Sequence, residues 1–90
     1  MELKKLRREI DKIDRKLIDL LVQRKSLVQK VGLFKKKHNL PIFNKAREKE
    51  IAKKLNKWAI KNGLRKTFLQ KIWGAMIEEA KLIEKKVKHK

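Results

Sequence analysis

An apolar seam in the first part of the chain limits its possible folds more than any other feature. Between residues 3 and 34, large apolar side chains recur every three or four positions, the spacing that places them on one face of an α-helix. The seam consists of Leu3, Leu6, Ile10, Ile13, Leu17, Leu20, Leu27, Val31 and Phe34. Arg24 occupies a position in this register, so a permanent cation lies in line with the apolar residues. The pattern predicts one long amphipathic helix with a charged interruption.

Two helix-breaking signals divide the chain into three predicted helices. Pro41 cannot continue a helix, and Gly63 suits the left-handed backbone that follows a helix C-terminus. The helices are expected over residues of about 3 to 38, 44 to 61 and 66 to 86. Asn44 is a suitable N-cap for the second helix, and the tail 87–90 is expected to fray. With no strand pattern or repeat, we predict an all-α fold in a single domain over residues 1–90.

The first helix is too long for a compact chain of this size. Its 36 predicted residues would span about 54 Å, whereas a compact globule of this chain length is roughly 30 Å across. Much of the seam would then face water unless another chain covered it. We therefore expect an intertwined, antiparallel homodimer in which the seams of two chains meet.

Charge and composition narrow the classes of function. The chain has 28 Lys and Arg against 10 Asp and Glu, a formal charge of +18, which favours anionic partners. The absence of cysteine excludes a disulfide framework and a thiol nucleophile, and His38 and His89 lie too far apart in sequence to suggest a metal site. No apolar run reaches the roughly 18 residues needed to span a bilayer, so we expect a cytoplasmic location.

Arg24 requires an anion if it lies in an interior, because a buried guanidinium is costly unless it is paired. Asp19 lies five residues before it and off its face, so the partner is either an acid from elsewhere or a bound carboxylate. Lys35 lies eleven residues later, close to three helical turns, and shares the face of Arg24. Arg47 and Glu48 open the second helix, where free N–H groups favour anions. This set suggests a pocket for a small organic dianion that carries a hydroxyl group.

Four segments in order resemble the all-helical class of chorismate mutase. They are LRREIDKID at 6–14, LLVQRKSLVQKVGLFK at 20–35, LPIFNKAREKEI at 40–51 and IEEAKLIE at 77–84. The resemblance implies an intertwined dimer with two equivalent pockets. It also implies conversion of chorismate to prephenate, for aromatic amino-acid biosynthesis, by an intramolecular [3,3] rearrangement without cofactor or covalent intermediate.

The resemblance also implies roles for individual residues. Arg24 and Arg47 would bind the substrate carboxylates, Lys35 would donate to the ether oxygen of the breaking bond, and Glu48 would accept from the ring hydroxyl. Arg7 would reach in from the other chain. A separate estimate agrees, because 24 − 7 = 17 residues span about 25 Å of helix, too far for both arginines of one chain to grip one small molecule.

Three positions depart from the family pattern. Asn44 stands where Asp is common, and Ala80 stands where Ser often helps to hold a carboxylate. Glu84 stands where Gln usually donates to the ether oxygen. Some fungal relatives are similar to this chain in carrying Glu at this position. Glu84 can donate only when it is protonated. The alternative is that Glu84 pairs with Lys81 or Lys85 and takes no part in the chemistry.

Two other functions remain possible from the residues. Aromatic side chains among lysines suggest a basic helical module that binds nucleic acid by stacking, and a related isochorismate-type lyase could use the same scaffold. Trp58, Phe68 and Trp73 follow helical spacing, however, and we interpret them as core residues. The positive charge is also spread along the chain, whereas nucleic-acid modules usually gather it on one face.

Overall fold

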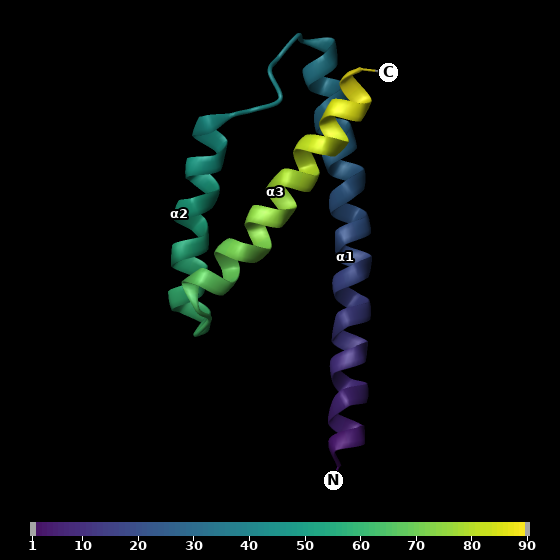
Figure 1. The fold of residues 1–90 in the computed structure, drawn as a ribbon, viewed down its shortest axis with the longest axis vertical. Helices are drawn as coiled ribbons and strands as arrows, with labels where there is room; N and C mark the ends of the chain where they lie inside the picture. The colour runs from purple at the N-terminus through teal and green to yellow at the C-terminus, as the bar shows by residue number, and fades with distance from the viewer. Residues whose placement is uncertain (1, 90) are drawn as a thin grey trace.

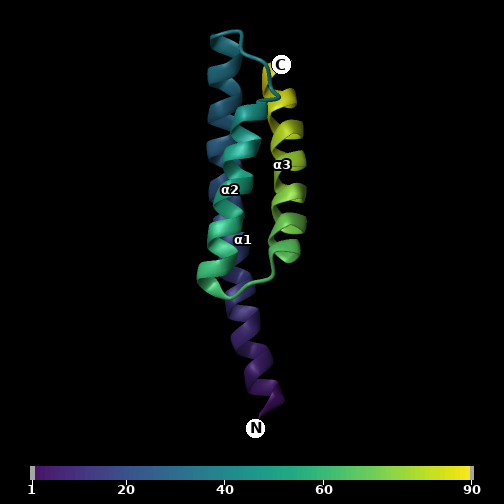
Figure 2. The ribbon, with the colours of Figure 1, turned by 90° about the vertical axis from the view of Figure 1, so that its left-hand side faces the viewer.

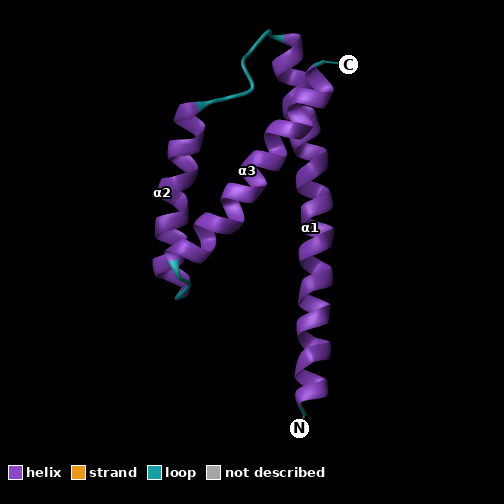
Figure 3. Ribbon diagram, viewed as in Figure 1, coloured by secondary structure: helices purple, strands orange, loops and turns teal. Residues whose placement is uncertain are grey.

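Three helices make up most of the molecule (Figures 1 and 3). The computed structural model describes residues 2–89, and its elements are α1 (Leu3–Lys37), α2 (Lys45–Asn62) and α3 (Lys66–Lys88). No strand occurs within this range. The all-α prediction is confirmed, and each predicted helix is present with ends within two residues of those predicted.

The boundaries of α2 follow from its capping residues. Asn44 has extended backbone, and its side-chain oxygen accepts a hydrogen bond from the Arg47 N–H at 3.0 Å. Gly63 ends the helix with φ 65°, a left-handed conformation that glycine adopts without steric cost. Both caps agree with the sequence prediction, and they fix where the first turn of α2 begins.

The prediction of a frayed tail was wrong at Val87 and Lys88, which are helical and extend α3 by two residues. The cause is a close approach to α1 at Gly32. A Cβ added to Gly32 would lie 3.2 Å from both the Cα of Glu84 and the Cβ of Val87. Because this packing holds the last turns of α3 against α1, the helix continues to Lys88. Lys90 lies outside the described residues.

α3 holds the molecule together because it packs on both other helices, whereas α1 and α2 do not pack directly on each other in the described range. Figure 1 shows α3 running diagonally from the lower end of α2 to the upper end of α1. The buried core is small and joins α2 to α3. It comprises Leu55, Ala59 and Leu69, with Ile51 and Trp73 packed against them. Trp58 and Phe68 were predicted as core, but they are 44% and 47% exposed in the single chain.

The N-terminal half of α1 stands apart from the other helices (Figures 1 and 2). The molecule measures 56 × 27 × 15 Å, and every residue from 3 to 23 is exposed. The apolar seam residues are each 45–60% exposed in the single chain. Across residues 2–89, no helix combines the length and apolar character needed to cross a membrane.

The close approach at Gly32 can be tested against a matched glycine. Gly74→Ala should raise the free energy of unfolding by roughly 0.5–1 kcal/mol, because Ala favours helix and nothing lies within 4 Å of the added methyl. Gly32→Ala should gain less or lose stability, since its methyl would press on α3. Denaturant unfolding at equal protein concentration measures both changes. Equal stabilisation of the two variants would contradict tight packing at Gly32.

Candidate active site

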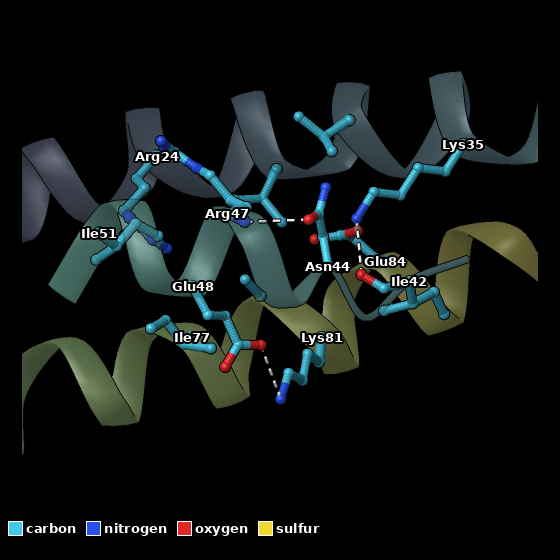
Figure 4. A pocket seen from close by; sticks show the side chains of 13 residues that line it. Arg24, Lys35, Ile42, Asn44, Arg47, Glu48, Ile51, Ile77, Lys81 and Glu84 are labelled. Atoms are coloured by element: carbon cyan, nitrogen blue, oxygen red, sulfur yellow. Dashed lines mark hydrogen bonds and ion pairs between the residues drawn. The ribbon is translucent and has the colours of Figure 1, made fainter. Parts of the chain in front are cut away.

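One pocket of about 350 Å³ lies among the three helices. Each helix contributes a stripe of residues spaced three or four apart, so the lining is one face from each. The stripes are Arg24, Val28, Val31 and Lys35 on α1, Asn44, Arg47, Glu48 and Ile51 at the start of α2, and Ile77, Ala80, Lys81 and Glu84 on α3. Ile42, in the connection between α1 and α2, completes the lining. Figure 4 shows these side chains converging from the three ribbons.

The pocket brings together seven of the predicted site residues. They are Arg24, Lys35, Asn44, Arg47, Glu48, Ala80 and Glu84. Arg7 is not among the lining residues, and it lies in the exposed N-terminal half of α1. Its contribution from a second chain therefore stays a prediction.

Lys35 and Glu84 form the most enclosed ion pair among the described residues. Lys35 Nζ lies 2.6 Å from Glu84 Oε1, and it also donates to the Ile42 carbonyl oxygen at 2.8 Å. The two side chains are only 16% and 10% exposed. The alternative pairing of Glu84 with Lys81 or Lys85 is not found within residues 2–89. Glu84 instead points into the pocket beside Lys35 (Figure 4).

Glu48 meets a cation that the sequence reasoning did not assign to the site. Lys81 Nζ lies 3.3 Å from Glu48 Oε2, and the hydrogen bond to Glu48 is the main cause that raises the pKa of Lys81 above its ordinary value. Lys81 also lies 3.4 Å from Glu78 Oε1 and 5.1 Å from the centre of the Phe43 ring. Its position was readable from the sequence, because residues 77, 80, 81 and 84 have the spacing of a single helix face.

The two arginines approach the same end of the pocket, away from Lys35 and Glu84 (Figure 4). Arg24 is half-buried, and no acid within residues 2–89 forms an ion pair with it, so the predicted alternative of a core ion pair is not found in this range. Arg47 pairs with Glu50 on the outside of α2. The hydrogen bond from Arg47, with the charge of Lys54, lowers the pKa of Glu50.

The charges of the lining suit a small dianion. Four cations and two carboxylates give the lining a formal charge of +2. The cations are Arg24, Lys35, Arg47 and Lys81, and the acids are Glu48 and Glu84. The other lining side chains are apolar, apart from Asn44, and carry no hydroxyl, thiol or imidazole. The arrangement can therefore bind, orient and polarise a ligand, but the described lining offers no Ser, Thr, Cys or His nucleophile.

Residues 6–85 match the family model described as "Chorismate mutase type II". A bifunctional chorismate mutase/prephenate dehydratase of Aquifex aeolicus is 40% identical over 90 residues, covering 97% of this chain and 25% of the relative. A chorismate mutase of Methanocaldococcus jannaschii is 31% identical, covering 93% of this chain and 85% of the relative. A 4-amino-4-deoxychorismate mutase of Streptomyces venezuelae is 28% identical, covering 92% and 81%.

The chain therefore belongs to the type II chorismate mutase family. It spans about a quarter of the length of the bifunctional Aquifex relative, whereas it covers most of the Methanocaldococcus protein. The family assignment agrees with the resemblance seen in the sequence, and the pocket described above lies wholly within the matched range.

Proposed function

We propose that this chain is a chorismate mutase, which converts chorismate to prephenate for aromatic amino-acid biosynthesis. The observation that carries the proposal is one pocket that brings together seven predicted site positions, three of which hold a residue unusual for the family, and whose formal charge of +2 complements a dicarboxylate. The membership of the chain in the type II family supports the same reaction. Because the reaction is an intramolecular rearrangement, the protein needs to supply orientation and charge stabilisation.

Binding the two carboxylates would hold the substrate in its compact reactive conformation. Arg24 and Arg47 lie at one end of the pocket, and Arg24 makes no ion pair within the described residues, so its guanidinium is available to a ligand. Arg47 would give up its exposed ion pair with Glu50 to bind a carboxylate of the substrate. An exposed pair of this kind contributes little stability, so the exchange costs little. Holding the reacting carbons together lowers the barrier by orientation.

Stabilisation of the transition state falls to the other end of the pocket. As the ether bond breaks, negative charge builds on its oxygen, and a fixed donor in an enclosed site is worth on the order of 3 kcal/mol. Lys35 is such a donor, because the Ile42 carbonyl holds its ammonium in place at 2.8 Å. Glu84 lies 2.6 Å from the same ammonium and would help as a second donor when its carboxyl carries a proton.

The working form that we propose is an antiparallel homodimer. The single chain buries only Leu55, Ala59 and Leu69 among its hydrophobic residues in the described range, while the seam of α1 stays half exposed. Covering that seam with the seam of a second copy would bury a large apolar area, which is the dominant driving force for association. In this dimer Arg7 of each chain would complete the pocket of the other.

The first prediction concerns the cations of α1. Purified protein should consume chorismate with saturation kinetics, followed by its ultraviolet absorbance, and Arg24→Ala and Lys35→Ala should each lower kcat/KM at least a hundredfold. Each substitution removes a contact with the substrate and leaves the seam intact. Product analysis separates prephenate from the pyruvate that a lyase would release.

Lys16→Ala and Lys57→Ala are the controls, because they remove the same charge from exposed positions outside the pocket. Their kcat/KM should stay near that of the wild type. Near wild-type turnover by Arg24→Ala or Lys35→Ala would show that the proposed site is wrong, and failure of the wild type to consume chorismate would reject the function.

The second prediction tests whether the sites are shared between chains. Arg7→Ala and Arg24→Ala should each be inactive, but mixing them and allowing exchange should restore activity. About half the dimers in an equal mixture are mixed, and each has one pocket with both arginines, so recovery should approach about a quarter of wild type. Native mass spectrometry verifies the exchange. Exchange without recovery would place Arg7 outside the pocket or in the pocket of its own chain.

The third prediction concerns Glu84 and pH. Only the protonated carboxyl can donate to the ether oxygen, so kcat/KM, measured over a range from about pH 5 to 8, should decline with rising pH. Glu84→Gln should flatten this profile and raise activity at neutral pH, because an amide donates throughout the range. Glu79→Gln, which neutralises an exposed acid of the same helix outside this pocket, should leave the profile unchanged. A flat wild-type profile, unaltered by Glu84→Gln, would remove Glu84 from the chemistry.

A further inference from the structure

The carboxylate that would meet the ring hydroxyl is already half of an ion pair. Lys81 engages one oxygen of Glu48, with Nζ lying 3.3 Å from Oε2, and the other oxygen, Oε1, is left to accept from a ligand. Both side chains are about one-third exposed, at 31% and 33%, so the pair lies at the edge of the pocket. Glu48 therefore faces a ligand with a cation beside it that opposes its negative charge.

Lys81 is held in this position from several sides. Its ammonium also lies 3.4 Å from Glu78 Oε1 on its own helix and 5.1 Å from the centre of the Phe43 ring. A lysine ammonium is charged throughout the neutral range, and the hydrogen bond to Glu48 raises the pKa of Lys81 further above its ordinary value. The pocket therefore has the positive charge of Lys81 beside the carboxylate of Glu48 (Figure 4).

We propose that Lys81 is a specificity-determining residue, which selects a neutral hydroxyl over a positively charged amino group at the ring position that Glu48 recognises. The proposal rests on the proposed function, in which Glu48 accepts a hydrogen bond from that hydroxyl. A bare carboxylate would attract an ammonium group more strongly than a hydroxyl. Lys81 opposes the attraction of an ammonium to Glu48 by repulsion. Glu78 also pairs with Lys81, but its side chain is 75% exposed, so solvent screening weakens its effect on that repulsion.

The two ligand types differ by a single group, which makes a direct comparison possible. The name of the Streptomyces relative, 4-amino-4-deoxychorismate mutase, identifies a chorismate analogue with an amino group in place of the ring hydroxyl. An aliphatic amine is largely protonated at about pH 6.5, since α-amino groups titrate near 8. The analogue therefore places a positive charge where chorismate places a neutral donor.

The test compares both substrates on four proteins: the wild type, Lys81→Met, Lys81→Arg and Lys85→Met. Met keeps the length of the side chain and removes the charge, whereas Arg keeps the charge. Lys85 is an exposed cation of the same helix that does not line this pocket, so Lys85→Met is the matched control. The measured quantity is kcat/KM for chorismate divided by kcat/KM for the amino analogue, at about pH 6.5. Where turnover of the analogue is too slow, its inhibition constant against chorismate replaces kcat/KM.

We expect the ratio to fall about tenfold in Lys81→Met, because the substitution removes the repulsion between Lys81 and the analogue's ammonium, an effect that solvent screens at a partly exposed site. It should stay near the wild-type value in Lys81→Arg and Lys85→Met. A role of Lys81 in stability alone would lower the activity on both substrates in parallel and leave the ratio unchanged. If thermal melting shows that Lys81→Met does not fold, Lys81→Gln tests the same loss of charge.

An unchanged ratio in the folded, uncharged variant would overturn the proposal while wild-type turnover of chorismate upheld the proposed function. An equal fall in Lys85→Met would also overturn it, because the effect would then come from general charge and not from Lys81. If the wild type turned over neither compound, the proposed function would fail and the specificity role would fall with it. These results are distinguishable because the wild-type measurement requires no substitution.

Discussion

The contact between α1 and α3 at Gly32 is the constraint on which the pocket depends. α3 is the element that packs on both other helices, so its separation from α1 sets the width of the space between α1 and α2. Because residue 32 is glycine, the backbone of α3 can approach α1 closely. A Cβ at this position would lie only 3.2 Å from the Cα of Glu84. The approach brings Glu84 within 2.6 Å of Lys35, so each of the two enclosed charges has a partner of opposite sign.

The charges of the pocket explain why Arg24 occupies a seam position. Its neighbours in the lining are arranged as partly balanced pairs, with Lys35 against Glu84 and Lys81 against Glu48. Arg24 has no such partner within residues 2–89, and Arg47 pairs outward with Glu50. The uncompensated charge at this end would be met by a bound dicarboxylate. In this proposal the two lysines pair with acids of the lining, whereas the two arginines bind the substrate, because arginine suits bidentate binding of carboxylates.

A second chain would address both the exposed seam and the small core. Three buried hydrophobic residues within the described range are few for a chain of 90 residues, since the hydrophobic effect is the main source of stability. Most of the exposed seam runs along the N-terminal half of α1, which no other helix within residues 2–89 covers (Figures 1 and 2). In the proposed homodimer the surface that stabilises the fold would be the same surface that delivers Arg7 to the pocket.

The sequence alone determined the three helices, because these depend on local rules, and about half of the residues that line the candidate site. Apolar periodicity, Asn44 as a cap and Gly63 as a terminator act within a few residues, and the family pattern identified seven of the thirteen lining residues, Lys81 not among them. Only the tertiary structure decided which charges meet. The partners of Glu84 and Lys81 are Lys35 and Glu48, on other helices, and the helix end at Lys88 depends on packing against α1. Such contacts join residues distant in sequence, and their distances depend on how the helices cross.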